Sequence, residues 1–598
     1  MTARPARGGM GAGTDPTPWL ILGVVGVGLA AAGVVWLGGT LAALCTGGGW
    51  HPPAFGTAFV EQVAHGRLAE LWPGTSPAAV WAVTGALLAL LVGTLITGYV
   101  LWQRRRPVPG DPLPSLATPA DVAGLGPRGV EARARGLRPS LTGQKIVAAA
   151  DAGVPLGDLV GSRRGHDLPL RASWEDVLLA VMAPRAGKTT ALAVPAIAQA
   201  PGPVVATSNK ADLWTVTSGA RRSRGTVWVF DPQRIAHHPQ QWWWDPLAEV
   251  RDVEAAHRLA QHFVLAKTDR GSGSGSDFWD KAAQELLTAL LLAAGCSGGT
   301  VADVYEWLTD SSARAPAAAL EGAGHLAVAL SLRGMQTGAT ETREGIYQTA
   351  RTSAQALRDP VILRWVTPPA DPLPQLHPAV FVTTDTLYLL SKDGAGSAAP
   401  LIAALTDATF RAGVAAAETA GGRLDPPLVA VLDEAANICR IADLPDLYSH
   451  LGSRGIIPVT ILQSYRQGVR VWGEPGMDAL WSAATVKVIG AGIDDARTAE
   501  DLSRLVGEHD VATVSSSRSR DGWSTSTSQR RQRILGPEDI RALPRGRALL
   551  LATGARAAML RLRPWYDGPD AQQLEAARQE AEALLRERAV QAKTVATG

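Results

Sequence analysis

The chain has 598 residues and a formal net charge of only +2. This length exceeds what a single hydrophobic core supports, so roughly two to four domains are expected. The small net charge gives no compositional argument for a nucleic-acid partner, and three scattered cysteines argue against a disulfide framework and against a zinc site.

Two charge-free apolar stretches stand near the N-terminus, at residues 19–45 and 78–102. Each exceeds the roughly 20 apolar residues that a helix needs to cross a bilayer core. A cleaved signal peptide is the alternative, but such a peptide has a shorter apolar core and no second span after it. We therefore expect residues 1–106 to form a membrane anchor with two transmembrane helices.

Arginines flank this pair of stretches on one side. The connecting loop holds one strong base, Arg67, whereas the outer flanks hold Arg4, Arg7, Arg104, Arg105 and Arg106. The positive-inside rule then places both termini, and with them the bulk of the chain, in the cytoplasm.

The region after the anchor begins with a Pro-, Gly- and Arg-rich segment, residues 107–141, which is predicted to be a linker. Short apolar runs at 176–182, 203–207 and 226–230 then alternate with helical periodicity. This alternation is typical of a parallel sheet that is covered on both faces. Residues 142–245 are therefore predicted to be the first part of an α/β domain.

The pattern becomes helical over residues 246–370, where a Gly/Ser stretch, 271–276, separates two predicted helices. We expect an all-α domain there, inserted into the α/β domain. Residues 371–568 would complete the α/β domain, and 569–598 would form a charged, solvated helix and tail. Strand-like runs in the second part lie at 379–384, 428–434, 458–464, 485–492 and 547–553.

The stretch VMAPRAGKTT, residues 181–190, follows an apolar run and opens a helical one, which is the context that a phosphate-binding P-loop needs. Backbone N–H groups at a helix N-terminus can surround a phosphate there. Lys188 would contact the β- and γ-phosphates, and the Thr189 hydroxyl would bind Mg²⁺. A chance GKT in a chain with 63 glycines is the alternative. The predicted nucleotide-binding residues are Arg185, Ala186, Gly187, Lys188, Thr189 and Thr190.

Met182 stands where the P-loop motif has its first glycine. Glycine there permits a tight turn, and Pro184 can instead pre-set a turn that begins one residue later. We expect a working site, so that Met182→Gly leaves transfer intact and at most tightens nucleotide binding.

Acidic and polar residues end two later strand-like runs. In LVAVLDE, Asp433 would hold magnesium through a water molecule, and Glu434 would act as the general base that activates the attacking water. In PVTILQS, Gln463 is placed to sense a γ-phosphate. Arg454, between the two runs, could reach across a subunit boundary and stabilise transition-state charge. The structural alternatives are a solvent-facing acidic strand end, a polar strand cap and a surface arginine.

Two further stretches invite a nucleic-acid interpretation. Residues 515–533 are rich in arginine and serine, which fits either a hairpin that faces DNA phosphates or another subunit, or a disordered polar loop. The three tryptophans Trp242–Trp244 could stack on bases, but packing at a domain junction is the favoured interpretation.

The motifs in this order resemble the coupling-protein ATPases of type IV secretion and conjugation, the TraG/TraD-like family. The similar stretches include LRASWEDVLLAVMAPRAGKTT, SNKADLW, DFWDKAAQELL and VLDEAANICRIADLPDLYSHLGSRGIIPVTILQSYRQ, and they span roughly residues 165–566. The resemblance implies a RecA-like motor fold with ATP and Mg²⁺ as cofactors. It also implies catalytic roles for Lys188, Glu434, Gln463 and, with a weaker match, Arg454.

The same resemblance implies a homo-hexamer at the inner membrane that moves DNA, or a relaxase–DNA complex, into a secretion channel. The implied partners are the relaxosome and the channel proteins. Lys210 and Asp212, in SNKADL, match a strand-end motif of the family near its site. Two other functions stay open: a docking receptor that uses ATP only for assembly, and a DNA translocase similar to FtsK. Pumps of the latter kind usually carry more spans and a C-terminal winged-helix reader, which this sequence does not show.

Overall fold

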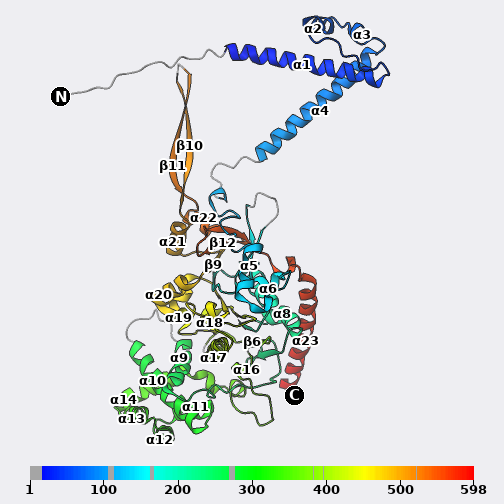
Figure 1. The fold of residues 1–598 in the computed structure, drawn as a ribbon. Coiled ribbons are helices and arrows are strands. Elements are labelled where there is room, and N and C mark those ends of the chain that lie inside the picture. The colour runs from blue at the N-terminus through cyan, green and yellow to red at the C-terminus, as the bar shows by residue number, and fades with distance from the viewer. Residues whose placement is uncertain are drawn as a thin grey trace, which may run out of the picture. The chain divides into compact units, whose positions relative to one another are not determined.

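The chain folds into two compact units, Met1–Pro109 and Gly110–Gly598, in a computed structural model (Figure 1). The structure describes residues 17–104, 113–161, 168–267, 276–381, 383–394, 396–519 and 522–597. The predicted flanking arginines Arg4, Arg7, Arg105 and Arg106 and most of the Gly/Ser stretch, 271–275, lie outside these ranges.

The first unit is built on two long helices, α1 (Thr17–Cys45) and α4 (Pro77–Arg104), joined through the short helices α2 (Thr57–Ala64) and α3 (Leu68–Leu71). Small residues allow the two long helices to meet, since a Cβ on Gly38 would lie 2.3 Å from the Thr84 hydroxyl oxygen. Val25–Cys45 and Pro77–Val100 are each long and apolar enough to cross a membrane. The helices thus coincide with both predicted spans.

The second unit is organised around an eleven-stranded sheet with the strand order β2-β1-β13-β12-β9-β3-β8-β7-β4-β6-β5. From β9 to β5 all neighbours are parallel, whereas β12, β13, β1 and β2 are added antiparallel at one side. The predicted parallel sheet is therefore right for one part and wrong for the other. The strand bounds are β1 Val154–Leu159, β2 Leu168–Ala172, β3 Leu178–Val181, β4 Val204–Ser208, β5 Val227–Phe230, β6 Thr386–Leu390, β7 Leu428–Leu432, β8 Ile456–Leu462, β9 Val486–Gly490, β12 Arg547–Ala552 and β13 Ala558–Arg561.

The parallel strands β3, β4, β6, β7 and β8 are buried at every position, which is why they read as continuous apolar runs. The antiparallel strands β1 and β2 were missed because Pro155, Gly157 and Pro169 interrupt their apolar pattern. The strand predicted at 379–384 is also wrong. Helix α16 (Pro378–Phe381) occupies its first part, and the buried strand β6 follows it.

The predicted linker, 107–141, is folded from residue 113 onward. Helix α5 (Pro127–Leu137) buries Val130 and Ala134, and the turns before it bury Leu116 and Val122. Proline and glycine in residues 113–141 therefore shape turns around a small core.

Helices cover the parallel part of the sheet and form the predicted all-α region, which packs around the buried leucines of α10 (Figure 1). In the all-α region these helices are α9 Val253–Lys267, α10 Ser276–Ser297, α11 Val301–Thr309, α12 Ala315–Gly322, α13 Leu326–Thr337, α14 Thr340–Ser353 and α15 Pro360–Leu363. Around the sheet they include α7 Val194–Gln199, α8 Asp212–Arg222, α17 Ala399–Thr419, α18 Ala435–Ile438, α19 Leu444–Leu447, α20 Tyr465–Ala483, α21 Ala496–Val506 and α22 Pro537–Arg541.

The structure decides between the alternatives for the tryptophans at 242–244 and for the Arg/Ser stretch at 515–533. Trp242 and Trp244 are buried, and Trp242 meets Trp228 and Trp365 edge to face at 5.9 and 5.7 Å, which confirms the packing interpretation. The Arg/Ser stretch forms most of a two-stranded ribbon, β10 (Glu508–Ser519) and β11 (Gly522–Arg533). It is a hairpin and not an irregular loop, although residues 520–521 and the side chains of 512–527 lie outside the described part.

The C-terminal helix, α23 (Ala571–Thr597), was predicted to be solvated, but one of its faces packs against α8. Leu574 and Ala581 are buried in this contact. Gly219 on α8 permits it, because a Cβ there would lie 2.6 Å from the Ala577 Cβ. The charged residues dominate the composition of α23 and conceal this narrow apolar face.

Candidate nucleotide site

The phosphate-binding loop predicted at 182–189 follows β3 and leads into a helix. Strand pairing continues past β3, because the Met182 N–H donates to the Leu462 carbonyl (3.0 Å) and the Ala183 N–H to the Ala491 carbonyl (3.2 Å). The left-handed positions come later, at Arg185 (φ 65°) and Gly187 (φ 99°). The chain therefore turns well after the position of the motif's first glycine.

Met182 has a different role from the glycine that it replaces. Its side chain is fully buried on Gly490 of β9, where an added Cβ would lie 2.4 Å from the Met182 Cε. Ala183 lies in the same way on Gly492, whose added Cβ would be 2.3 Å from the Ala183 Cβ. The close approach of Met182 and Ala183 thus requires glycine at the end of β9 and just after it.

The predicted lysine and acidic pair come together at the carboxyl edge of β3 and β7. Lys188 hydrogen-bonds the Glu434 carboxylate, and its Nζ lies 3.3 Å from Asp433 Oδ1. The Thr189 hydroxyl donates to Asp433 Oδ2 at 3.3 Å. Both carboxylates are buried, and Glu434 takes a left-handed backbone conformation (φ 57°) that aims it at the loop. The Thr190 hydroxyl donates to the Gly187 carbonyl within the loop itself, at 3.4 Å.

The charges in this cluster act strongly on one another. Burial lowers the pKa of Lys188, but Asp433 and Glu434 outweigh burial and hold the pKa above its ordinary value. Burial raises the pKa of Asp433, and the neighbouring carboxylates Glu434 and Asp212 raise it further against the opposing effect of Lys188. Asp433 therefore lies buried between one positive group, Lys188, and two negative ones, Glu434 and Asp212.

The donor set fits magnesium. Asp433 Oδ1 is buried and accepts no hydrogen bond from the described residues, although Lys188 lies within ion-pair distance. A carboxylate oxygen with free lone pairs beside the Thr189 hydroxyl is the kind of oxygen environment that Mg²⁺ takes.

Gln463, at the end of β8, joins the cluster as predicted. Its amide donates to Glu434 Oε2 at 2.7 Å, and Asn437 donates to the same oxygen at 3.2 Å. Gln467 closes the network, because it donates to Asn437 Oδ1 (2.9 Å) and accepts from the Gln463 N–H (2.8 Å). Asn437 and Gln467 were not predicted, although each lies one helical turn after a predicted residue.

The other predicted residues lie at different places. Lys210 and Asp212 follow β4, the strand next to β7, and the charge of Asp212 reaches Asp433. Arg454 precedes β8, whereas Gln463 follows it, so a seven-residue strand of about 20 Å separates Arg454 from the cluster. There Arg454 pairs with Glu418 at 3.3 Å. Within one chain it does not reach the site, and its action on a neighbouring subunit stays a prediction.

Comparisons with known proteins show which proteins the whole chain resembles. Residues 427–545 match the sequence family described as the TraM recognition site of TraD and TraG. Two Escherichia coli proteins named conjugal transfer protein TraG are each 26% identical, one over 67% of both chains and the other over 33% of both. The solved structure of the bacterial conjugative coupling protein TrwBdeltaN70 superposes with a TM-score of 0.51 at 18% identity, over 66% of this chain and 87% of that one. This likeness confirms the predicted RecA-like α/β fold with an inserted all-α domain.

Proposed function

We propose that the chain is a conjugation coupling protein and that it acts as a membrane-anchored, Mg²⁺-dependent ATPase. Its proposed task is to drive DNA, or a relaxase–DNA complex, into a type IV secretion channel. The observation that carries the proposal is the convergence of Lys188, Thr189, Asp433, Glu434 and Gln463 at one edge of the sheet.

The proposed chemistry assigns each residue a step. When bound, Mg²⁺ would neutralise charge on the β- and γ-phosphates, held there by Thr189 and Asp433. Lys188 would leave Glu434 for the phosphates, because a polyphosphate offers it more negative charge than one carboxylate does. Glu434, still oriented by Gln463 and Asn437, would then accept the proton of the attacking water.

The partners and location follow from the same premise. The segment matched by the TraM-recognition family contains the β10–β11 ribbon, α20 and α21, which supports a relaxosome contact on this part of the surface. We propose DNA and the channel proteins as further partners, and a homo-hexamer as the assembly. The two apolar helices α1 and α4 would anchor it in the inner membrane, with the second unit in the cytoplasm.

Hydrolysis by the full-length protein in lipid nanodiscs, with and without single- and double-stranded DNA, tests this function. We expect DNA to stimulate turnover, Lys188→Ala to abolish ATP binding, and Glu434→Gln to keep binding while turnover falls about 10²–10⁴-fold. ATP binding without turnover, together with DNA transfer supported by Lys188→Ala, would instead identify a docking receptor.

A further inference from the structure

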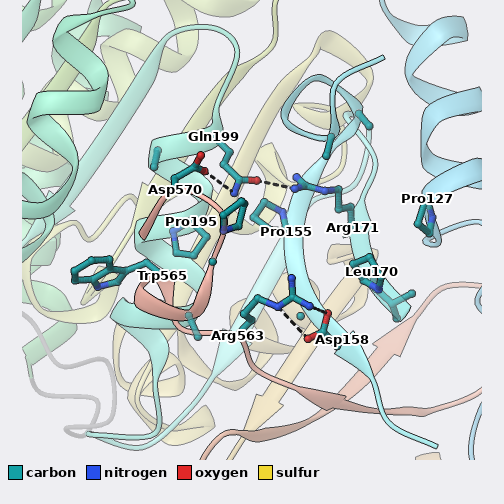
Figure 2. A pocket seen from close by; sticks show the side chains of 18 of the residues that line it. Pro127, Pro155, Asp158, Leu170, Arg171, Pro195, Gln199, Arg563, Trp565 and Asp570 are labelled. Atoms are coloured by element: carbon teal, nitrogen blue, oxygen red, sulfur yellow. Dashed lines mark hydrogen bonds and ion pairs between the residues drawn. The ribbon is translucent and has the colours of Figure 1, made fainter. Parts of the chain in front are cut away.

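The antiparallel strands β1, β12 and β13 of the large sheet each have a neighbouring strand on both sides. The buried carboxylate of Asp158 on β1 accepts two hydrogen bonds from Arg563, at 3.1 and 2.6 Å (Figure 2). Figure 2 also shows Gln199, which accepts a hydrogen bond from Arg171 at 2.6 Å and donates one to Asp570 at 3.4 Å. In this region the strand edges and the charged side chains both find partners within the chain.

The β10–β11 ribbon has no such neighbours along its edges. It forms a sheet of its own with two strands, whose register runs from Glu508↔Arg533 to Ser519↔Gly522 without a shift. In an antiparallel pair every second residue directs its N–H and C=O groups away from the other strand, so about six residues of each strand leave these groups open. Within the described residues, each strand of the ribbon pairs with the other strand alone.

The ribbon lacks the features that usually protect strand edges from pairing with another chain. Natural sheets use lysine, proline or a bulge for this purpose. Residues 508–533 contain no lysine and no proline, and the described ladder has no bulge. A two-stranded ribbon is also only marginally stable in water unless it buries an apolar face, and this one contains four apolar residues, Val511, Ala512, Val514 and Trp523. Further strands at its edges would therefore stabilise it.

The base of the ribbon is tied to its surroundings by both strands. Arg533 of β11 donates two hydrogen bonds to Glu500 of α21, both at 2.7 Å. At the beginning of β10, the His509 imidazole hydrogen-bonds the Ser115 hydroxyl. Figure 1 shows the ribbon extending from this base away from the large sheet of the second unit. The open edges thus belong to a segment that is anchored at one end only.

The two strands carry opposite charges near this base. Glu508 and Asp510 are exposed on β10, whereas Arg530 and Arg531 are exposed on β11. In the described part of the chain, no hydrogen bond or ion pair joins Asp510, Arg530 or Arg531 to another side chain. Farther out, residues 512–517 and 524–529 include no charged residue, so identical strands can adjoin there without charge repulsion.

A second copy of the ribbon matches this distribution of charge. In a closed ring a rotation relates each subunit to the next, and this rotation keeps every residue at the same height along the ring axis. With the ribbons along that axis, β10 of one subunit runs antiparallel beside β11 of the next. The register Asp510↔Arg531 then occurs between subunits as it does within the ribbon, so that exposed carboxylates of one copy face exposed guanidinium groups of the other.

DNA is the other occupant that the Arg/Ser composition suggests. The ribbon holds five arginines, but it also holds Glu508, Asp510 and Asp521. The first two of these carboxylates lie in register with Arg533 and Arg531, so a phosphate at either arginine would also meet a carboxylate. This mixed charge suits a second copy of the ribbon better than it suits a polyanion.

We propose that the β10–β11 ribbons of neighbouring subunits pair edge to edge and close into one antiparallel β-barrel. The inference rests on the proposed homo-oligomeric assembly and extends it, because it names a surface through which the copies join. Closure leaves no strand edge of the ribbon open.

Cysteine cross-linking of the full-length protein in isolated membranes tests the pairing. One cell coproduces two differently tagged variants, Asp510→Cys and Arg531→Cys, both with the exposed Cys45 replaced by serine. After mild oxidation we expect a disulfide-linked dimer that carries both tags and includes up to about half of the chains, since random mixing sets the variants in the required order at about one quarter of the interfaces. Each variant produced alone should give only background.

Arg530→Cys takes the place of Arg531→Cys in the matched control. Successive residues of a strand point to opposite faces, so this thiol lies on the other face of the ribbon from the thiol at position 510. We expect several-fold less linked dimer with this control. Equal linking by Arg530→Cys and Arg531→Cys would contradict the register and with it the inference.

Charge reversal gives a second measurement, by mass photometry in detergent. Asp510→Arg sets like charges opposite one another at every interface, so the assembled fraction should fall several-fold, and Arg531→Asp in the same chain should restore it. Equal assembly of Asp510→Arg and the wild type would contradict the pairing.

The mass of the wild type separates this inference from the proposed assembly. An oligomeric wild type whose cysteine variants do not link overturns the ribbon pairing and leaves the assembly standing, whereas a monomeric wild type overturns both. If Arg530→Ala and Arg531→Ala instead weaken the binding of single-stranded DNA while the oligomer mass and the absence of linking persist, the ribbon contacts DNA and the inference is wrong.

Discussion

At the scale of single residues, Met182 fills space inside the sheet next to the phosphate loop. Removing its side chain leaves a cavity on Gly490, since the three heavy atoms nearest to a Cβ built on that glycine all belong to Met182. Met182→Gly should therefore destabilise the second unit by about 2–5 kcal/mol, which a fluorescence-monitored thermal melt would show. The mild effect expected from the sequence motif alone is replaced by this larger one.

Met182→Leu is the control for this prediction, because it keeps the volume and should cost less than about 1.5 kcal/mol. A melting temperature of Met182→Gly equal to that of the wild type would show that the side chain does not support the loop.

Gln463 orients Glu434 through the 2.7 Å hydrogen bond. Gln463→Ala should lower the ATP turnover number while the Kd for ATP stays the same, because the amide touches the proposed general base, Glu434, and not the phosphate loop. Steady-state hydrolysis and equilibrium binding separate the two quantities. Gln467→Ala, which acts one bond further away, should have a smaller effect on turnover. A Gln463→Ala enzyme with full turnover would remove this residue from the site.

The central residues of the candidate site were predictable because they occur as two pairs of neighbours in the sequence. Lys188 and Thr189 are adjacent, and Asp433 and Glu434 end one apolar run. The space filled by Met182 was not predictable, because it depends on a glycine of another strand, Gly490. Tertiary contacts between distant segments leave no periodic signal in a single sequence.

At the scale of secondary-structure elements, the contact between α8 and α23 contains a titratable group. His238 meets Trp214 of α8 edge to face at 6.0 Å, and burial, followed by the charges of Arg588 and Arg222, lowers its pKa from 6.5 to about 4. The fold thus favours the neutral imidazole. The resulting stability is complete above pH 6.5 and is lost as the pH falls toward 4.

Thermal melts between pH 7 and pH 4 should therefore show a falling midpoint, with a loss on the order of 1–2 kcal/mol that this histidine contributes. In His238→Gln this part of the pH dependence should disappear. A variant that keeps the full acid sensitivity would assign the effect to other groups.

Strands that are apolar at every position were predicted well. Helices and strands that bury only one side against a neighbouring element were not. The fully buried strands β3, β7 and β8 follow apolar runs in the sequence. Helix α5 and strand β2 have mixed composition, because each buries only one side. Their fold depends on a surface that other elements supply.

At the scale of the whole molecule, the all-α domain is hydrogen-bonded to the segment that follows Glu434, the proposed general base. Arg440, two residues after α18, donates to the Ala436 carbonyl at 2.7 Å and to the Leu265 carbonyl, near the end of α9, at 3.2 Å. His262 of α9 also lies 3.6 Å from the Asp407 carboxylate of α17. A movement of α18 that follows nucleotide binding would therefore act directly on α9.

Arg454 can be tested only in the assembled protein, because it lies far from the site of its own chain. Lys188→Ala and Arg454→Ala should each be inactive alone if the arginine serves a neighbouring subunit. Mixed in equal amounts, they should recover up to about one quarter of the wild-type turnover, since random mixing restores that share of interfaces. No recovery in mixed rings, or full turnover of Arg454→Ala alone, would exclude the role across subunits.

The pairing of Asp158 with Arg563 has a consequence for how the protein is made, because these residues lie 405 positions apart in the chain. The ribosome releases the phosphate loop early. It releases β13 and the segment after it, which carries Arg563, almost last. A chain that terminates before β13 would carry the P-loop and the acidic pair, yet it would lack Arg563, Trp565 and the helix that covers α8. Only near-complete translation therefore yields the ion pair between Asp158 and Arg563.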